Sequence, residues 1–237
     1  MLSQRVSVKL KVEVTFEMIN INISDELKDK CPGIALGCVE AEVRVKEGAE
    51  DLWNRINEKC KEIQDTLKPE EILKVTNIAG SRSAYKTIGK DPSRYRLSSE
   101  SLLKRIVKGL GLYKVNNVVD INNLISIASG YSVGTYDLNK VHGEIAFVIG
   151  KAGETYNGIG RGPINLEKLP VFEDDLGKFG SSTSDSERAM ITEETKHILM
   201  NIISFDGEEG LGKYMDYAIK LLNKYAEGKL IDKKIVR

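Results

Sequence analysis

The sequence contains few of the residues that metal sites and disulfide frameworks need. Its 237 residues include two histidines and three cysteines. His142 and His197 stand far apart with no HxH or HExxH pattern, and Cys31, Cys38 and Cys60 lack the close spacing of zinc ligands. We therefore expect no metal and no cofactor, and we expect the three thiols to be buried as small apolar groups.

Long apolar runs are missing too. No stretch approaches the roughly 20 apolar residues of a membrane-spanning helix. Residues 1–16 alternate charged with apolar side chains instead of forming the core of a signal peptide. Only 5 prolines argue against long disordered linkers, and the 41% apolar and 30% charged fractions are typical of a globular protein. We expect a cytoplasmic protein without membrane contact, folded as a single domain over residues 1–237.

Several common catalytic motifs are also absent. There is no Gly-x4-Gly-Lys-Ser/Thr string, whose backbone N–H groups would cradle phosphates, and no Gly-x-Ser-x-Gly elbow. The glycine-rich residues 158–162 lack the spacing of a dinucleotide-binding loop, so we interpret them as a turn. Any catalysis must then rest on backbone groups, hydroxyls, amides and carboxylates.

Alternation and helical periodicity predict the secondary structure. Apolar residues alternate with polar ones over residues 6–16, which predicts an N-terminal strand within residues 1–20, and residues 34–45 form a second apolar stretch. Residues 51–67, with apolar side chains at three- and four-residue steps, predict an amphipathic helix. Further helices are expected over the ranges 79–88, 98–108 and 208–227, and residues 115–205 are expected to be mostly sheet. Together these elements indicate an α+β domain.

The expected helix over residues 98–108 has its own start signal. Ser98 or Ser99 is expected to be the N-cap, and Glu100 lies in the first turn, where a carboxylate complements the helix dipole.

Charge is segregated although the formal net charge is zero. Between Arg82 and Lys108 there are eight basic residues and two acids, a local excess of +6. Residues 167–194 hold eight acids and three basic residues, a local charge of −5. The basic stretch, with Tyr85 and Tyr95 interleaved, has the composition to bind phosphates and stack bases. Alternatively, it is a solvated helix face paired with acids elsewhere in the fold.

Several separate blocks resemble one known domain. They are Val118-Val119-Asp120-Ile121-Asn122-Asn123, Tyr136-Asp137-Leu138-Asn139-Lys140, Gly143-Glu144-Ile145, Gly153-Glu154 and Thr192-Glu193-Glu194-Thr195. In order and spacing they resemble the B3/B4 domain of the bacterial phenylalanyl-tRNA synthetase beta chain. The stretch from Arg82 to Glu100 is similar to freestanding proteins built from this domain. The resemblance, strongest over residues 79–205, implies an α+β domain with a central, mostly antiparallel sheet flanked by helices.

The resemblance also implies a function. In the synthetase this domain hydrolyses tyrosine wrongly esterified to phenylalanine tRNA, and freestanding relatives are similar to trans-acting deacylases or tRNA-binding proteins. Asn123 falls on the family's editing-site asparagine, and Asn122 on its hydroxyl-bearing neighbour. An amide can donate to an ester carbonyl and accept from an ammonium group, so both are candidate catalytic residues. Alternatively, Asp120 and Asn123 cap a helix that starts after Val119.

The candidate substrate pocket departs from the family's pattern. Gly134 stands where the synthetase has a histidine, and Asn201 stands where it has a glutamate that reads the tyrosine hydroxyl. The family's small glycine-containing stretch is replaced by hydroxyl-rich residues that include Ser182, Thr183 and Asp185. These five positions form the predicted substrate-binding set, with specificity other than for tyrosine. Alternatively, the hydroxyl-rich stretch is an exposed loop with ordinary turn composition.

These observations predict a trans-editing deacylase that binds the aminoacylated end of a tRNA, with no DNA partner. Five basic residues are its predicted tRNA contacts: Arg82, Lys86, Arg94, Arg96 and Arg105. One alternative is a non-catalytic B3/B4 module that binds tRNA or an amino-acid-like ligand. Another is a protein-interaction subunit that docks through the acidic residues 167–194.

Overall fold

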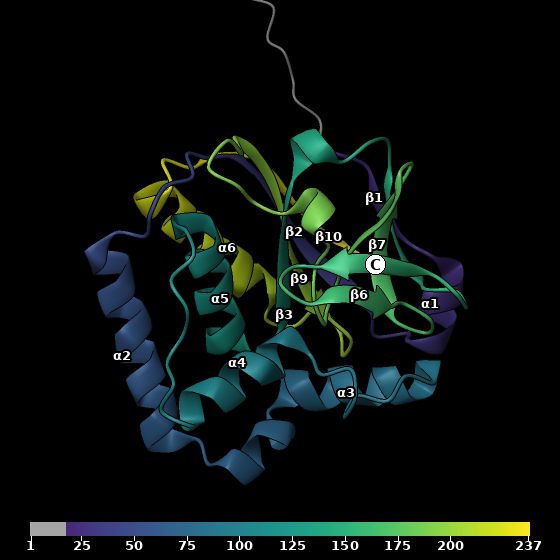
Figure 1. Cartoon of the computed structure of the whole chain (residues 1–237), viewed down its shortest axis with the longest axis horizontal. Helices are drawn as coiled ribbons and strands as arrows, with labels where there is room; N and C mark the ends of the chain where they lie inside the picture. The colour runs from purple at the N-terminus through teal and green to yellow at the C-terminus, as the bar shows by residue number, and fades with distance from the viewer. Residues whose placement is uncertain (1–17) are drawn as a thin grey trace, which may run out of the picture.

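The computed structural model describes residues 18–237 and has an α+β architecture (Figure 1). The α-helices are α1 (Asp25–Lys30), α2 (Glu50–Thr66), α3 (Thr76–Ile88), α4 (Ser98–Val107), α5 (Asn117–Ser129) and α6 (Leu211–Tyr225). The strands are β1 (Ile21–Ile23), β2 (Ala35–Glu42), β3 (Ser132–Asp137), β4 (Ile145–Ile149), β5 (Thr155–Gly158), β6 (Gly162–Asn165), β7 (Pro170–Asp174), β8 (Gly177–Ser181), β9 (His197–Ser204) and β10 (Lys229–Val236). Short 3₁₀ turns are η1 (Pro69–Lys74), η2 (Leu138–Lys140) and η3 (Glu187–Ala189). The α+β fold class expected from the sequence is confirmed, whereas the strand expected over residues 6–16 lies outside the described residues.

The strands form two four-stranded sheets and a separate hairpin. One sheet has the order β10-β2-β9-β3 and is antiparallel throughout. The other has the order β1-β4-β7-β8, in which only the β1–β4 pair is parallel. The hairpin pairs β5 with β6. The expected mostly antiparallel pairing is therefore present, but it is divided between two sheets.

The two sheets pack face to face through aromatic side chains. Tyr136 of β3 contacts Phe179 edge-on, with ring centroids 4.9 Å apart, and Phe147 stacks on Phe172 at 4.3 Å. All four rings are fully buried. Successive strand residues point to opposite faces, so Gly134 and Tyr136 face this aromatic layer while Thr135 points to the other side of the sheet.

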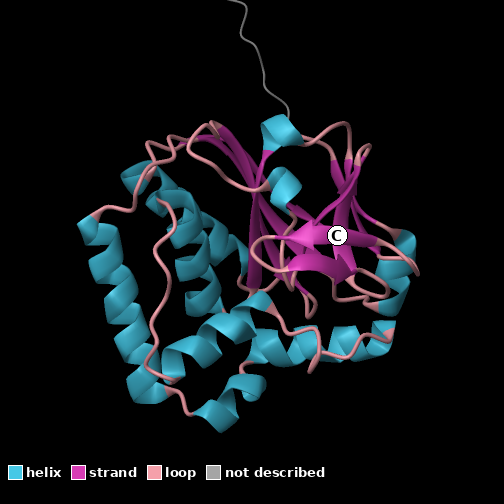
Figure 2. Ribbon diagram, in the orientation of Figure 1, coloured by secondary structure: helices cyan, strands magenta, loops and turns pink. Residues whose placement is uncertain are grey.

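Helices cover the second face of the β10-β2-β9-β3 sheet. A Cβ on Gly37 of β2 would meet Met215 of α6, which shows how closely this helix approaches the strand. The helix α5 packs beside α6 and against β3. Figure 2 shows most of the longer helices to the left of the strands and below them, with α1 at the right. Among residues 18–237 we find no helix with the length and apolar character needed to cross a membrane.

Most elements expected from periodicity are present. The helix predicted over residues 51–67 is α2, whose buried side chains include Leu52, Ile56, Cys60 and Ile63. The stretch 34–45 contains β2, and the ranges 79–88, 98–108 and 208–227 contain most of α3, α4 and α6. The three cysteines are buried thiols, as expected, and burial raises the pKa of Cys38 to about 12.

Two details of the sequence analysis are wrong, the N-cap of α4 and the start of α5. The N-cap of α4 is Leu97, which makes no side-chain cap, and not Ser98 or Ser99. The range 115–205 is mostly sheet, as expected, since it holds β3 to β9, but it begins with the 13-residue helix α5, whose N-cap Asn116 accepts a hydrogen bond from the Val119 N–H. Asp120 therefore lies in the first turn of the helix instead of preceding it. The sequence analysis also did not anticipate β10, which pairs with β2 at the sheet edge.

Asn117, at the start of α5, connects three distant segments. Its Nδ2 donates to the carbonyls of Arg44 and Tyr225, each at 2.9 Å, and its Oδ1 accepts from the Lys46 N–H at 3.0 Å. The residue has no exposed surface. Because buried backbone groups need partners, this amide fixes α5 against the chain before α2 and the end of α6.

We expect Asn117→Ala to lower the free energy of unfolding by about 2–4 kcal/mol, because it leaves buried backbone groups without partners. Urea titration followed by circular dichroism measures the change. Asn157→Ala, at an exposed position of β5, is the matched control and should change the free energy of unfolding by less than about 0.5 kcal/mol. Equal stabilities of the two variants would contradict this role of Asn117.

Candidate functional site

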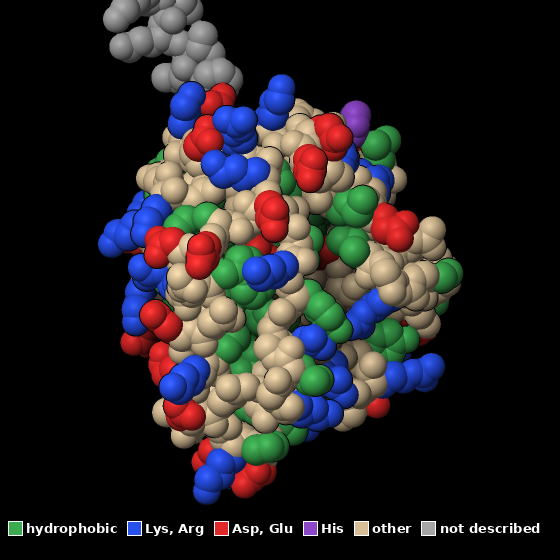
Figure 3. Space-filling view, turned by 60° about the vertical axis from the view of Figure 1, so that its left-hand side comes forward, with side chains coloured by type: hydrophobic (Ala, Val, Ile, Leu, Met, Phe, Trp, Pro, Cys, Tyr) green, Lys and Arg blue, Asp and Glu red, His purple; other side chains and the backbone are tan. Residues whose placement is uncertain are grey.

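A basic pocket of about 510 Å³ opens between the start of α4, the β5–β6 hairpin and the loop after β8. Its lining residues are Ser93, Arg94, Tyr95, Arg96, Ser101, Arg161, Pro163, Ile164, Asn165 and Thr183. Three of these are arginines, all exposed, and none is an acid. Figure 3 shows Lys and Arg side chains gathered on the lower right of the face it displays. The pocket therefore presents a concentrated positive charge in a chain with zero net charge.

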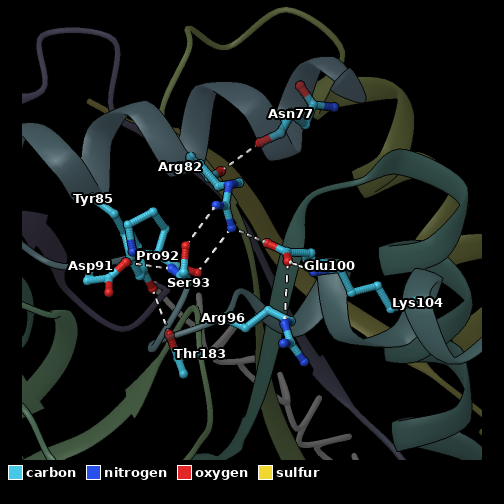
Figure 4. A network of polar contacts seen from close by, with 11 residues as sticks. Asn77, Arg82, Tyr85, Asp91, Pro92, Ser93, Arg96, Glu100, Lys104 and Thr183 are labelled. Carbon is cyan, nitrogen blue, oxygen red and sulfur yellow. Dashed lines mark hydrogen bonds and ion pairs between the residues drawn. The ribbon is translucent and has the colours of Figure 1, made fainter. Parts of the chain in front are cut away.

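A buried carboxylate positions the loop that carries Arg94 and Arg96 (Figure 4). Glu100 of α4 has no exposed surface. Its Oε2 lies 2.8 Å from Nη1 of Arg82 on α3, and its Oε1 lies 3.4 Å from Nε of Arg96. Lys104, one turn later on α4, also pairs with Glu100. Arg82 Nη1 donates further to the Pro92 carbonyl at 3.1 Å, which fixes the 91–96 loop to α3.

Arg161 is brought to the pocket by the turn between β5 and β6. The hairpin is attached to the loop after β8, because Tyr156 of β5 donates its hydroxyl proton to the Ser184 carbonyl at 2.5 Å. The Ile159 N–H donates to the Asp185 carbonyl at 3.0 Å. Gly160 and Gly162 have positive φ angles, which fits the turn expected over residues 158–162.

The hydroxyl-rich stretch after β8 is a buried loop, so its interpretation as an exposed loop is wrong. Ser182 is 1% exposed and Thr183 is 8% exposed. Both hydroxyls lie within hydrogen-bond distance of the Tyr85 hydroxyl, at 2.7 and 2.9 Å. Thr183 forms part of the pocket wall. Since its partners hold the loop in place, the wall is preorganised.

Of the two interleaved tyrosines, Tyr85 is too deeply buried for a base to stack on it, whereas Tyr95 lines the pocket. Tyr85 has no exposed surface, and burial raises its pKa to about 12. Tyr95 is half-buried, and the ammonium group of Lys90 lies 3.6 Å from the centre of its ring. Lys90 itself is buried and donates to the carbonyls of Asn165 and Glu167. Burial lowers the pKa of Lys90 to about 8.

The five predicted tRNA contacts occupy different environments. Arg94 and Arg96 line the pocket, whereas Arg82 lies beneath it with Glu100. Lys86 is exposed on α3. Arg105, on α4, lies with its guanidinium 3.7 Å from the centre of the Tyr113 ring. The structure thus brings two of the five together in one pocket.

Asn122 and Asn123 lie side by side on α5, half-buried. Thr135 of β3 donates its hydroxyl proton to Asn122 Oδ1 at 2.9 Å, and Asn122 Nδ2 lies 3.5 Å from Asn123 Oδ1. Thr135 points away from the aromatic layer that Gly134 faces. The asparagine pair and Gly134 therefore lie on opposite sides of β3, and neither asparagine lines the basic pocket.

Gly134 and Asn201 are register partners on β3 and β9, buried between the two sheets. A Cβ on Gly134, or on Gly180 of β8, would collide with the hydroxyl of Tyr136. The space over both glycines is thus filled by the ring of Tyr136. Asn201 is fully buried, and its amide nitrogen and oxygen have no hydrogen-bond partner among the described residues. This part of the predicted substrate set faces a packed layer.

Asp185 belongs to the loop after β8, and its side chain contacts Tyr136 of the aromatic layer. Its Oδ1 accepts from the Tyr136 hydroxyl at 2.8 Å and from the Ser181 N–H at 3.1 Å. Burial raises the pKa of the Asp185 carboxyl to about 6, although these two hydrogen bonds oppose the shift. Burial also raises the pKa of Tyr136, so its hydroxyl remains a donor.

Sequence reasoning missed Arg161 as a member of the pocket. The only signal was a basic residue within the glycine-rich turn, 65 positions after Arg96 and outside the basic stretch. Within residues 18–237, no three His, Cys, Asp or Glu side chains gather in a group suited to holding a metal ion.

We expect the free energy of unfolding of Asp185→Asn to increase, relative to that of the unchanged chain, as the pH rises from 4 to 7. The folded state of the unchanged chain keeps the Asp185 proton up to about pH 6, whereas the ordinary pKa is 3.8. The contribution of Asp185 to stability is thus fully present below about pH 4 and is lost as pH rises through about 6.

The asparagine variant does not titrate, so its stability advantage should grow by about 2–3 kcal/mol over this range. Urea unfolding at several pH values measures it, with Asp65→Asn on the exposed face of α2 as control. A pH-independent difference between Asp185→Asn and the unchanged chain would show that Asp185 has an ordinary pKa.

Similarities to known proteins extend over different lengths of the chain. The phenylalanine–tRNA ligase beta subunit of Fusobacterium nucleatum is 28% identical over 113 residues, which cover 46% of this chain and 14% of that protein. An N-terminal fragment of the phenylalanyl-tRNA synthetase beta subunit from Pyrococcus horikoshii aligns with a TM-score of 0.47 and 15% identity, covering 94% of this chain and 52% of the fragment. The chain thus spans about a seventh of its curated relative and about half of the solved fragment. The family model described as the B3/4 domain matches residues 80–235, and the chain therefore belongs to the B3/4 domain family.

Proposed function

We propose that the protein binds tRNA, with the unpaired 3′ end of the RNA in the basic pocket. The observation that carries this proposal is the pocket wall, which has three exposed arginines and no carboxylate. Guanidinium groups bind phosphate oxygens in a fork geometry, and a nucleic acid end presents several phosphates in series. A relative that is a phenylalanine–tRNA ligase subunit supports tRNA as the RNA. A tRNA partner would place the protein in the cytoplasm.

The ion pairs of the pocket support this assignment. Glu100 offsets part of the charge of Arg82, Arg96 and Lys104 beneath the pocket. Neither Arg94 nor Arg161 has an acidic partner within ion-pair distance among residues 18–237. Their charge is therefore available to a ligand from solution. The bases of that ligand would meet Pro163 and Ile164 on the opposite wall.

We expect tRNA binding to weaken steeply with salt, because each phosphate contact releases condensed counterions. The logarithm of the affinity should fall by roughly 0.7 to 0.9 per logarithmic unit of salt for each contact. Arg94→Ala and Arg161→Ala should each reduce that slope by about one contact. Fluorescence anisotropy of labelled tRNA between 50 and 300 mM salt measures it.

Lys61→Ala, an exposed lysine on α2, is the matched control and should leave the slope unchanged. A tRNA whose 3′ nucleotides have been removed should bind less tightly than intact tRNA. Binding that does not depend on salt, or on the two arginines, would overturn the proposed function.

Hydrolysis of a mischarged aminoacyl ester is a second candidate function. The observation that favours it is Asp185, whose carboxyl has a pKa near 6 and follows the Thr183 pocket wall by two residues. At neutral pH such a carboxylate is ionised and basic enough to accept a proton from water. Since Gly134 and Asn201 carry no ionisable group, we expect little activity on tyrosine esters and more on esters of small or polar amino acids.

Asn123 gives a separate test of ester hydrolysis, because it lies on the opposite side of β3 from Asp185 and the two residues would contact an ester at different places. If its amide stabilises the oxyanion of the ester, Asn123→Ala should reduce the deacylation rate by about 100- to 1000-fold with an unchanged melting temperature. Asn123→Asp should be at least as damaging, because it places a negative charge beside the oxyanion. A panel of mischarged tRNAs measures the rate, with Asp185→Asn tested in parallel.

The control is Asn157→Ala on β5. A stable Asn123→Asp protein with full activity would remove Asn123 from the site. If the unchanged chain hydrolyses none of the esters but binds tRNA, the non-catalytic binding function stands alone.

A further inference from the structure

The loop between α4 and α5 exposes an unusual group of apolar side chains beside unpaired cations. Leu110, Tyr113 and Val115 lie within one stretch of six residues, and they are 57%, 67% and 58% exposed. Arg105, Lys108 and Lys114 stand in or beside the same loop and have no acidic partner within ion-pair distance among residues 18–237. Isolated exposed apolar residues are ordinary, whereas a contiguous group with like charges indicates an interaction surface.

Arg105 and Tyr113 form a preassembled stack within this loop. The guanidinium carbon of Arg105 lies 3.7 Å from the centre of the Tyr113 ring. Arg105 also donates to the Leu110 carbonyl at 3.2 Å, which fixes the loop to the end of α4. One side of the Tyr113 ring is thus covered by a cation, while two-thirds of the residue remains open to solvent. A rigid aromatic face beside a cation suits a flat, electron-rich partner.

The sequence around Arg105, Lys108 and Lys114 contains no carboxylate that could pair with them. The sequence from Ser101 to Val119 contains no Asp or Glu. The next acid, Asp120, is buried and accepts hydrogen bonds from Trp53 Nε1 at 2.8 Å and from the Val115 N–H at 3.1 Å. The loop itself therefore carries only positive charges, which matches a polyanion better than it matches an acid-poor protein or a neutral lipid surface.

We propose that Tyr113, supported by Arg105, is a stacking platform for an unpaired base of bound RNA, with Lys108 and Lys114 at its phosphates. This inference rests on the proposed function and adds a second contact to it. The helix α4 connects the two places, since Arg96 and Ser101 of the basic pocket lie at its start and Arg105 at its end. Its ten residues span about 15 Å. One extended single strand can therefore reach from the pocket to the platform.

The side chain at position 113 separates stacking from other kinds of contact. Base stacking on an aromatic ring is lost on replacement by alanine, typically with a 5- to 150-fold weaker affinity, about 1–3 kcal/mol per base. We expect Tyr113→Ala to weaken binding of a single-stranded oligoribonucleotide and of intact tRNA by a factor in this range. Tyr113→Phe keeps the ring and should bind like the unchanged chain. Tyr113→Leu keeps apolar surface but has no aromatic face, and it should bind as weakly as Tyr113→Ala.

The experiment is fluorescence anisotropy on the full chain with three labelled probes: intact tRNA, a ten-nucleotide single strand and a blunt RNA duplex. The duplex offers few unpaired bases, so Tyr113→Ala should change its affinity by less than about twofold. Leu176→Ala, at an exposed apolar residue of the β7–β8 turn, is the matched control and should bind every probe normally. Ultraviolet crosslinking to a 4-thiouridine strand, mapped by mass spectrometry, should label Tyr113.

The possible outcomes distinguish the two proposals. Unchanged affinity of Tyr113→Ala for the single strand, with Arg94→Ala impaired, would overturn the platform and leave the pocket in place. Normal binding by Tyr113→Leu would also overturn it, because it would show an apolar contact instead of stacking. Failure of the unchanged chain to bind any RNA would overturn both proposals. Melting temperatures exclude misfolding, which is not expected for an exposed side chain.

Discussion

The buried carboxylate of Glu100 is the constraint on which the candidate site depends. A carboxylate without exposed surface must be paired with cations, because an unpaired buried charge costs several kcal/mol. Arg82 from α3, Arg96 from the preceding loop and Lys104 from the next turn of α4 all meet at this group. Pairing Glu100 therefore fixes α3, the 91–96 loop and α4 in one arrangement, and this arrangement places Arg94 over the pocket.

The same pairing explains how a chain of zero net charge contains a strongly basic site. Part of the local excess of +6 is used on Glu100, while Glu173, Asp174 and Asp185, three of the eight acids of residues 167–194, are paired or buried inside the fold. Asp174 is held by Arg188 at 2.8 Å, and Lys178 pairs with both Glu154 and Glu173. The acidic stretch is thus neutralised only in part, and its interpretation as a docking face stays a prediction. Arg94 and Arg161 of the pocket have no such partners among residues 18–237.

Periodicity predicted the elements whose buried and exposed faces differ. Leu52, Ile56 and Ile63 mark the buried side of α2. The strand β2 was found from a continuous apolar stretch instead, because it lies between β10 and β9 and is buried on both faces. Periodicity failed for α5. Besides Val118, Ile121, Leu124 and Ile127, this helix buries residues on its other sides, so it has no exposed polar face from which a helical repeat could be recognised. Periodicity also failed for β10, a strand at the sheet edge whose alternating side chains are mostly exposed.

The sequence predicted only those residues of the candidate site that lie close to one another in the chain. Arg94 and Arg96 were found from a count of charges over one stretch, whereas Arg161 depends on the docking of the β5–β6 hairpin through Tyr156. The filling of the space over Gly134 by Tyr136 depends on how two sheets pack, because the ring also needs Gly180 from another strand. Contacts of this kind join residues about 45 positions apart and leave no pattern in a single sequence.

The packing of Tyr136 has a consequence for where a ligand can bind. Its ring closes the space between the sheets, and its hydroxyl holds Asp185, the residue that ends the hydroxyl-rich loop. The other face of that loop carries Thr183, which lines the basic pocket. A single short loop thus separates a sealed aromatic layer from an open, positively charged pocket. Since its hydroxyls are already bonded to Tyr85 and Tyr156, the pocket wall keeps its shape when a ligand arrives, and little binding energy is spent on ordering it.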